Sequence, residues 1–169
     1  PVLTAQLIDY QCKGMQNRGQ IVEVKHFAMN DQERNRYGLC VFADEQTVRE
    51  TYLKAFELPL SKGHANGLMS AFSRFGCKWS GRCENLMTTV LRNEWGFEGL
   101  AESDAAVGKY MNDNNAMAEA VIAGQDNWDS AASFENNKFK NFANKYYPDV
   151  EIISINPVGL KGIFKEQTV

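Results

Sequence analysis

The chain has 169 residues, of which 44% are hydrophobic and 23% charged, a composition typical of a globular protein rather than a disordered or membrane one. The formal net charge is -3, and the basic residues are scattered among acidic ones, which argues against a nucleic-acid partner because phosphate binding needs a concentrated basic face. No stretch approaches the roughly 20 consecutive apolar residues of a membrane span, so we expect no membrane partner.

The chain is predicted to alternate helices and strands. Apolar residues at three- and four-residue steps indicate helices, and short apolar or β-branched runs indicate strands. The predicted elements are, in order, a helix over 4–16, a strand over 21–24, a helix over 45–63, a strand over 67–72, a helix over 86–95, a strand over 97–104, a helix over 111–123, a short strand over 124–128, a helix over 134–147 and a strand over 150–155. Asp44 is the predicted N-cap of the second helix. The polar segments 27–44 and 73–82 are predicted to be loops.

The order of these elements favours an α/β fold. No internal repeat and no Pro/Gly/Ser-rich linker divides the chain, so we expect one domain over 1–169. Strands that alternate with helices indicate parallel βαβ units. The carboxyl ends of such strands lie on one side of the sheet, which is where α/β folds hold their chemistry.

The four cysteines, Cys12, Cys40, Cys77 and Cys83, form no CxxC pair, and the chain has only two histidines. This spacing argues against a structural zinc site. We interpret the cysteines as reduced thiols of a cytosolic protein, with a Cys77–Cys83 loop disulfide as the alternative. The compartment stays open, and the cytoplasm is favoured.

Three successive predicted strands carry polar groups at their ends, at Lys25-His26, at 70–72 with Ser70, and at Ser103-Asp104. A carboxylate beside a lysine and a histidine stays ionised and can bind hydroxyl groups or attack carbon. The alternative is that these polar strand ends only face water, and the pattern alone does not decide between the two.

Three segments, 24–33, 68–72 and 94–104, resemble successive motifs of glycoside hydrolase family 3, in the order and at the spacing of that family. The resemblance covers residues 1–128 and leaves 129–169 as a helix–strand tail of unclear match. It implies a partial (β/α)8 barrel of the TIM-barrel type, in which this chain supplies about the second half. An open half-barrel exposes sheet edges, so we expect a second copy of the chain or a complementing chain or domain to complete it.

The same resemblance implies a retaining, β-glucosidase-like hydrolase acting on a carbohydrate substrate without a metal or organic cofactor. Asp104 stands at the position of the nucleophile, which forms a covalent glycosyl intermediate. Lys25 and His26 stand where the family binds the hydroxyl groups of the glycone. Met69 and Phe72 would lie near the sugar, with Phe72 where the family often has tyrosine.

The chain departs from the family pattern at two places. Ala105 follows the predicted nucleophile where the family usually has tryptophan, and no residue matches the acid/base. Glu102 is a poor substitute, because it lies two residues before Asp104 on the same strand and projects lower on the same side. These departures keep open a non-catalytic module that binds sugar or forms oligomers.

Four other residues are conspicuous in the sequence. Trp79 and Trp128 lie in predicted rim segments, where they would either stack on a sugar ring or pack against the protein. His64 is predicted to be a surface residue near a helix end rather than a ligand. Asp126 is predicted to be a hydrogen-bond partner at the rim.

Overall fold

The computed structural model describes residues 1–36, 38–104 and 116–128. The predicted helix over 134–147, the strand over 150–155, the first part of the helix over 111–123 and Ala105 lie outside these residues. Within the described ranges the chain has an α/β fold built on a parallel sheet, as the sequence predicts.

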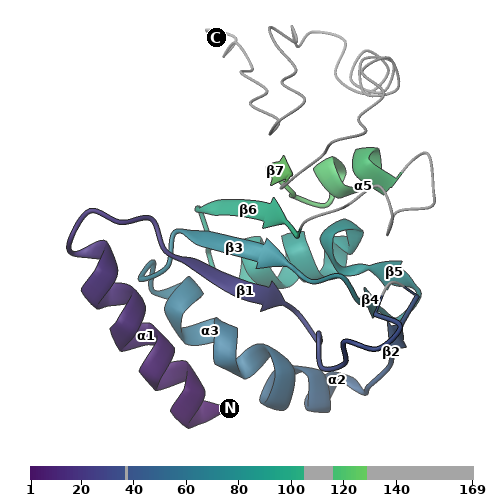
Figure 1. Ribbon diagram of the computed structural model, residues 1–169, viewed down its shortest axis with the longest axis horizontal. Helices are drawn as coiled ribbons and strands as arrows, with labels where there is room; N and C mark the ends of the chain where they lie inside the picture. Colours follow the sequence, from purple (N-terminus) through teal and green to yellow (C-terminus); the bar gives the residue numbers. More distant parts are fainter. Residues whose placement is uncertain (37, 105–115, 129–169) are drawn as a thin grey trace, which may run out of the picture.

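The main sheet has four strands in the order β1-β3-β6-β7, and every neighbouring pair is parallel. The strands are β1 (Glu23–Phe27), β3 (Gly67–Ser70), β6 (Leu100–Ser103) and β7 (Asn127–Trp128). The arrowheads of β1, β3 and β6 point the same way in Figure 1, and β1 forms one edge of the sheet. Each strand is followed by helical structure before the next begins, as parallel pairing requires.

One face of this sheet forms the hydrophobic core. Val24, Leu68 and Ala101 are aligned across β1, β3 and β6 and are at most 7% exposed. Because successive residues of a strand point to opposite faces, the intervening positions face away from this core. Two aromatic contacts, of Phe27 with Phe56 and of Phe27 with Trp95, extend the same core.

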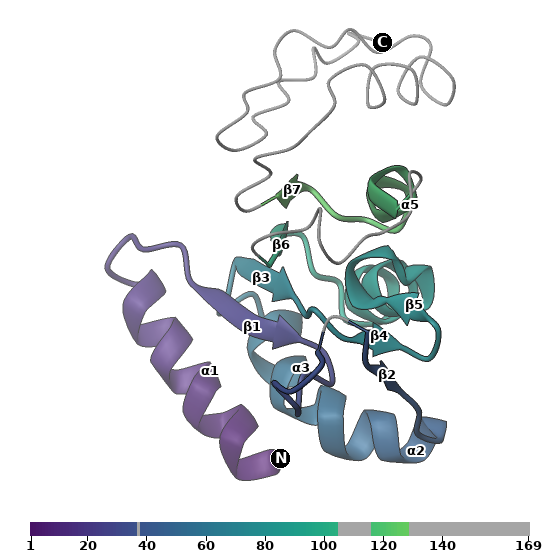
Figure 2. The ribbon, with the colours of Figure 1, turned by 45° about the vertical axis from the view of Figure 1, so that its right-hand side comes forward.

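The helices begin and end close to where the sequence predicts them. The first is α1 (Val2–Gln16), and it lies beside α3 (Lys54–Ser61) in both views of the molecule (Figures 1 and 2). Helical structure from residue 45 to 61 comprises α2 (Glu45–Thr47), the π-helical segment η1 (Val48–Leu53) and α3. A second π-helical segment, η3 (Asn85–Glu94), and α5 (Ala116–Ile122) follow.

Asp44 caps the second of these helical regions. Its Oδ1 accepts a hydrogen bond of 2.9 Å from the backbone N–H of Thr47, which confirms the predicted N-cap. Donation of this bond to the ionised carboxylate lowers the pKa of Asp44. The cap fixes where the chain leaves the long segment that follows β1.

The two segments predicted to be loops contain a second, small sheet. Its strands are β2 (Cys40–Val41), β4 (Arg74–Phe75) and β5 (Lys78–Trp79), and a 3-10 turn, η2 (Ser80–Arg82), follows them. β4 pairs parallel with β2 and antiparallel with β5. Figure 1 shows this sheet beyond the carboxyl ends of β1 and β3. The prediction of plain loops was therefore wrong for 40–41, 74–75 and 78–79.

The boundary of the first strand also differs from the prediction of 21–24. Ile21 is 79% exposed, whereas Lys25 is paired with Met69 of β3, so the strand begins later and runs to Phe27. Pairing with a distant strand sets this boundary, and local composition does not report it. As a result, Lys25 and His26 lie inside the strand rather than after its end.

Candidate active site

The pairing of β1 with β3 is irregular where Lys25 and His26 lie. The register between β1 and β3 shifts between Lys25 and Phe27: Lys25 is opposite Met69, and Phe27 is already opposite Ser70. Two consecutive residues of a regular strand point to opposite faces, but a bulge re-aims one of them. Lys25 contacts Met69 on β3, and His26 contacts Asp104 after β6.

Asp104 follows the last residue of β6, and its carboxylate meets His26. The distance between His26 Nε2 and Asp104 Oδ2 is 3.2 Å, and the two side chains are 32% and 12% exposed. The strand order places β3 between the two strands, so the pair spans the carboxyl ends of three neighbouring strands. A partly buried carboxylate that remains open to solvent can act on a ligand placed above it.

Met69 lies between these groups on β3. Its Sδ is 3.9 Å from the Nζ of Lys25, and its side chain is only 5% exposed. The ammonium group of Lys25 therefore rests on a thioether surface while Lys25 itself stays exposed. This arrangement offers a cation beside an apolar floor.

Phe72, two residues after the end of β3, is nearly buried. It is 6% exposed, and the guanidinium carbon of Arg36 lies 4.4 Å from the centroid of its ring. This geometry is that of a cation–π contact. Arg36 thereby joins the segment after β1 to the segment after β3, on the side of the sheet where Asp104 lies.

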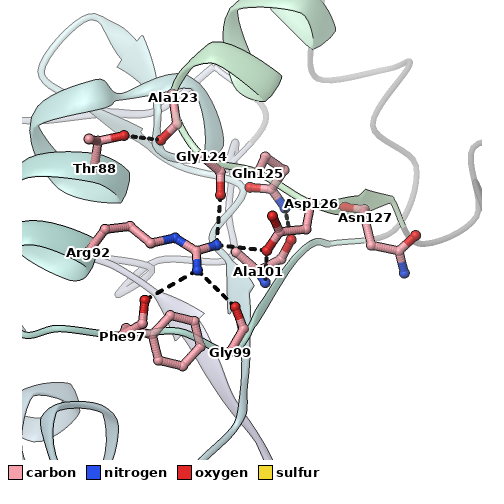
Figure 3. A network of polar contacts seen from close by, with 10 residues as sticks. All are labelled: Thr88, Arg92, Phe97, Gly99, Ala101, Ala123, Gly124, Gln125, Asp126 and Asn127. Atoms are coloured by element: carbon pink, nitrogen blue, oxygen red, sulfur yellow. Dashed lines mark hydrogen bonds and ion pairs between the residues drawn. The ribbon is translucent and has the colours of Figure 1, made fainter. Parts of the chain in front are cut away.

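A network around Arg92 fixes the strand that leads to Asp104 (Figure 3). Arg92 Nη1 donates to the carbonyl groups of Phe97 and Gly99, and Nη2 donates to the carbonyl group of Gly124 and, at 2.7 Å, to the carboxylate of Asp126. The same Oδ2 of Asp126 accepts a bond of 2.8 Å from the backbone N–H of Ala101 in β6. One guanidinium group therefore holds the chain before β6 and before β7 together.

A glycine allows the close approach at the start of β6. A Cβ atom on Gly99 would lie 2.3 Å from the carbonyl oxygen of Asn66, and that oxygen accepts a bond of 2.9 Å from the N–H of Leu100. Any side chain at this position would push β6 away from the segment before β3. Gly99 thus helps to set the height of Asp104 relative to Met69.

The other conspicuous residues have structural partners. Trp79 is 4% exposed and donates from Nε1 to the carbonyl group of Ala71 at 2.8 Å, so it packs against the protein rather than at a sugar-binding rim. His64 is 2.6 Å from the carboxylate of Asp9. Asp126 directly precedes β7 and accepts hydrogen bonds from Arg92 and Ala101, so it is a hydrogen-bond partner as predicted, but at the amino end of the strand rather than at the rim. The side chain of Trp128 lies outside what the structure describes.

The state of the cysteines and the arrangement of the described side chains bear on disulfide formation and metal binding. All four cysteines are free, which overturns the alternative of a Cys77–Cys83 disulfide. Burial, and next the charge of Asp9, raises the pKa of the Cys12 thiol. Among residues 1–36, 38–104 and 116–128, no group of three or more His, Cys, Asp or Glu side chains is arranged to hold a metal ion. In the same ranges no helix combines the length and apolarity needed to cross a membrane.

Residues 1–128 match the model of the glycosyl hydrolase family 3 N terminal domain. The chain belongs to glycoside hydrolase family 3. Its resemblance to the family, predicted from three segments of the sequence, is confirmed.

Curated relatives and solved structures agree with this assignment. A beta-glucosidase of Ruminococcus albus is 34% identical over 104 residues, which cover 62% of this chain and 11% of that protein. A beta-glucosidase of Rhizobium radiobacter is 33% identical over 126 residues, covering 75% of this chain and 15% of that protein. The chain thus spans less than a fifth of the length of either relative.

Two solved structures match at the level of the fold. Beta-glucosidase 3B from Thermotoga neapolitana in complex with glucose gives a TM-score of 0.75 at 32% identity, covering 86% of this chain and 20% of that one. A beta-glucosidase from Kluyveromyces marxianus gives a TM-score of 0.77 at 25% identity, covering 86% of this chain and 17% of that one.

Sequence reasoning missed several residues that position the strands of this candidate site. Arg92, Gln125 and Asn127 contact backbone groups or side chains on other elements, and no local periodicity reports such contacts. The one available signal is the concentration of Arg92, Gly96 and Gly99 between a helix and a strand. That concentration indicates a tight connection but not the partner of the arginine.

Proposed function

We propose that this chain forms part of the catalytic barrel of a retaining β-glucosidase, with Asp104 as the nucleophile. The observation that carries the proposal is the 3.2 Å contact of Asp104 with His26 at the carboxyl ends of neighbouring parallel strands. A side chain that is 12% exposed is shielded from bulk water yet can still reach a ligand. Lys25, His26, Met69 and Phe72 are the proposed glycone-binding residues.

The relatives supply the substrate class. The two curated relatives are beta-glucosidases, and the similar Thermotoga neapolitana enzyme was solved with glucose. A glucose ring has hydroxyl groups around its edge and C–H groups on its faces. The ammonium group of Lys25 suits a hydroxyl oxygen, and the thioether of Met69 suits a C–H face, so this part of the sheet fits such a ring.

In the proposed reaction the carboxylate of Asp104 attacks the anomeric carbon while the bond to the leaving oxygen breaks. The product of this step is a glycosyl ester on Asp104, which water then hydrolyses to release the sugar and restore the carboxylate. His26 holds the carboxylate in place through its ring nitrogen. No metal or organic cofactor takes part in this scheme.

The reaction also needs a carboxyl group roughly 5 Å from the nucleophile to protonate the leaving oxygen. We propose that residues 1–128 of one chain do not supply this group or the remaining barrel strands. Their source is then a second copy of the chain, a complementing chain or a further part of a longer chain. The parallel sheet, with β1 at its edge, is in keeping with a partial barrel.

A mechanism-based 2-fluoroglucoside with an activated leaving group tests the proposal. Its deglycosylation is slow, so the glycosyl ester should accumulate and peptide mass spectrometry should find it on Asp104. Asp104→Asn is the matched control and should give no adduct. A folded wild-type chain that shows no adduct at saturating reagent contradicts the assignment.

The second candidate is a non-catalytic module that binds sugar or forms oligomers. It is favoured by Ala105, which stands where the family usually has tryptophan. Turnover of an aryl glucoside separates the two candidates, because an activated leaving group needs little acid assistance. Turnover that Asp104→Asn abolishes excludes the non-catalytic module.

A further inference from the structure

A row of four side chains crosses the sheet one layer below Asp104. The register aligns Lys25 of β1 with Met69 of β3, Met69 with Glu102 of β6, and Glu102 with Asn127 of β7. Residues aligned across neighbouring strands project from the same face of a sheet. This is the face opposite the buried row that contains Leu68.

Glu102 is held in place within this row. Asn127 Nδ2 donates a hydrogen bond of 2.7 Å to Glu102 Oε1. The backbone of Asn127 is fixed in turn, because Gln125 Nε2 donates to its carbonyl group and to that of Ala101. In Figure 3 the side chain of Asn127 points away from Arg92. A carboxylate oriented by a fixed partner loses little freedom when it binds a ligand.

The row has the chemistry of a polyol site. From β1 to β7 the row consists of an ammonium group, a thioether, a carboxylate and an amide. Lys25 Nζ contacts Met69 Sδ within it. A carboxylate accepts hydrogen bonds from hydroxyl groups, whereas the ammonium group of Lys25 only donates them. The two charged residues therefore flank the Met69 floor with complementary hydrogen-bonding roles.

The position of Glu102 favours binding over acid/base chemistry. It lies two residues before Asp104 on the same strand, a separation of about 6.6 Å along the strand axis, and projects from the same face. The two carboxyl groups of a retaining enzyme flank the scissile bond, and two residues stacked on one strand lie on one side of it. Glu102 is thus placed to contact the glycone deeper in the site.

We propose that Glu102, oriented by Asn127, is a specificity-determining residue that accepts hydrogen bonds from hydroxyl groups of the glycone. The inference rests on the proposed function, since it deepens the same site by naming the residue that selects a hydroxylated ring. Neither residue belongs to the set derived from the family resemblance.

Direct binding of glucose and its monodeoxy analogues, measured by calorimetry, tests this inference without requiring hydrolysis. Glu102→Gln keeps the shape of the side chain and removes the charge. We expect it to weaken glucose binding about tenfold. The loss should vanish for the one monodeoxy analogue that lacks the contacted hydroxyl group. Wild type and Glu102→Gln both bind that analogue without this hydrogen bond, so their affinities for it should be equal. Asn127→Ala should show the same analogue dependence with a smaller loss.

Glu98→Gln is the matched control, because Glu98 is exposed and precedes the same strand. It should leave every affinity unchanged. The inference is overturned if Glu102→Gln loses the same affinity for every analogue, or if Glu98→Gln loses as much affinity as Glu102→Gln. It is also overturned if the folded wild-type chain binds none of these sugars. If the loss in Glu102→Gln depends on one hydroxyl group but the 2-fluoroglucoside leaves no adduct on Asp104, only the hydrolase proposal is rejected. If the adduct forms but the loss depends on no single hydroxyl group, only the role of Glu102 is rejected.

Discussion

At the scale of single residues, the contact between His64 and Asp9 stabilises the position of α1, although the two residues are far apart in the sequence. His64 Nδ1 is 2.6 Å from Asp9 Oδ1, and the Asp9 side chain is 9% exposed. The contact joins α1 to the segment after α3, 55 positions later in the chain. A buried carboxylate is costly without a partner, so His64 holds α1 in place.

Replacing His64 by alanine should lower the free energy of unfolding by about 1–3 kcal/mol, because it leaves the Asp9 carboxylate buried without this partner. Urea denaturation at neutral pH measures the change. Asp9→Asn in the same background should recover part of the loss, since an amide is cheaper to leave unpaired than a charge. Gln11→Ala, an exposed change on the same helix, should stay within about 0.5 kcal/mol. A loss no larger than that control contradicts the interpretation.

The residues of the candidate site differ in how well the sequence predicts them. His26 and Asp104 come from the family resemblance and from the rule that parallel strands present their carboxyl ends together. The register shift of β1 between Lys25 and Phe27 depends on the pairing of β1 with β3, which the sequence does not report. Glu102 was discounted as an acid/base, and its partner Asn127 was not singled out, because their contact joins two strands that are adjacent only in the folded sheet.

At the scale of elements, two arginines with similar sequence contexts have different roles. Arg49 and Arg92 both lie in π-helical segments and both bind a carboxylate. Arg49 is 41% exposed and binds Glu94 and Glu45 at the surface. Arg92 is 23% exposed and binds three backbone carbonyl groups as well as Asp126.

Arg92→Leu should therefore cost about 2–4 kcal/mol of stability, because it strands several carbonyl groups and the Asp126 carboxylate. Arg92→Lys should lie between this variant and the wild type, since one ammonium group cannot reproduce the guanidinium fork. Arg49→Leu, the matched control, should cost less than about 1 kcal/mol, as exposed ion pairs do. Thermal and urea unfolding of the three variants measure these differences, and equal losses for the two leucine variants would contradict the role of the network.

The elements that the sequence predicts best are those with a local cause. α1 and the capped helical region from residue 45 follow from apolar spacing and from the Asp44 cap. β2, β4 and β5 have two residues each and exist only because segments 34 residues apart, such as those of Cys40 and Arg74, come together. No window of sequence contains that information, which is why both segments were predicted to be loops.

At the scale of the whole molecule, one border of the described chain carries several exposed apolar side chains. Leu3, Leu7 and Tyr10 follow one another along α1 at helical spacing and are 69%, 62% and 73% exposed, and Ile21 is 79% exposed. β1 also forms the edge of the main sheet and pairs, among the described residues, with β3 alone. Exposed apolar helix faces and open sheet edges are both surfaces that proteins normally cover.

A second copy of the chain is the partner we propose for this border, because two copies related by a two-fold axis bury the same apolar side chains and cover the same open edge in both. The folded chain should therefore sediment with a mass well above 19.0 kDa. Leu7→Glu places a charge in the middle of the border and should weaken the association at least about tenfold, whereas Asn93→Asp, an exposed change on η3 outside this border, should not. Circular dichroism must show that both variants remain folded. A folded wild-type chain that sediments as a single copy at every concentration contradicts the two-fold assembly, and the border would then be covered by a different chain or by a further part of a longer one.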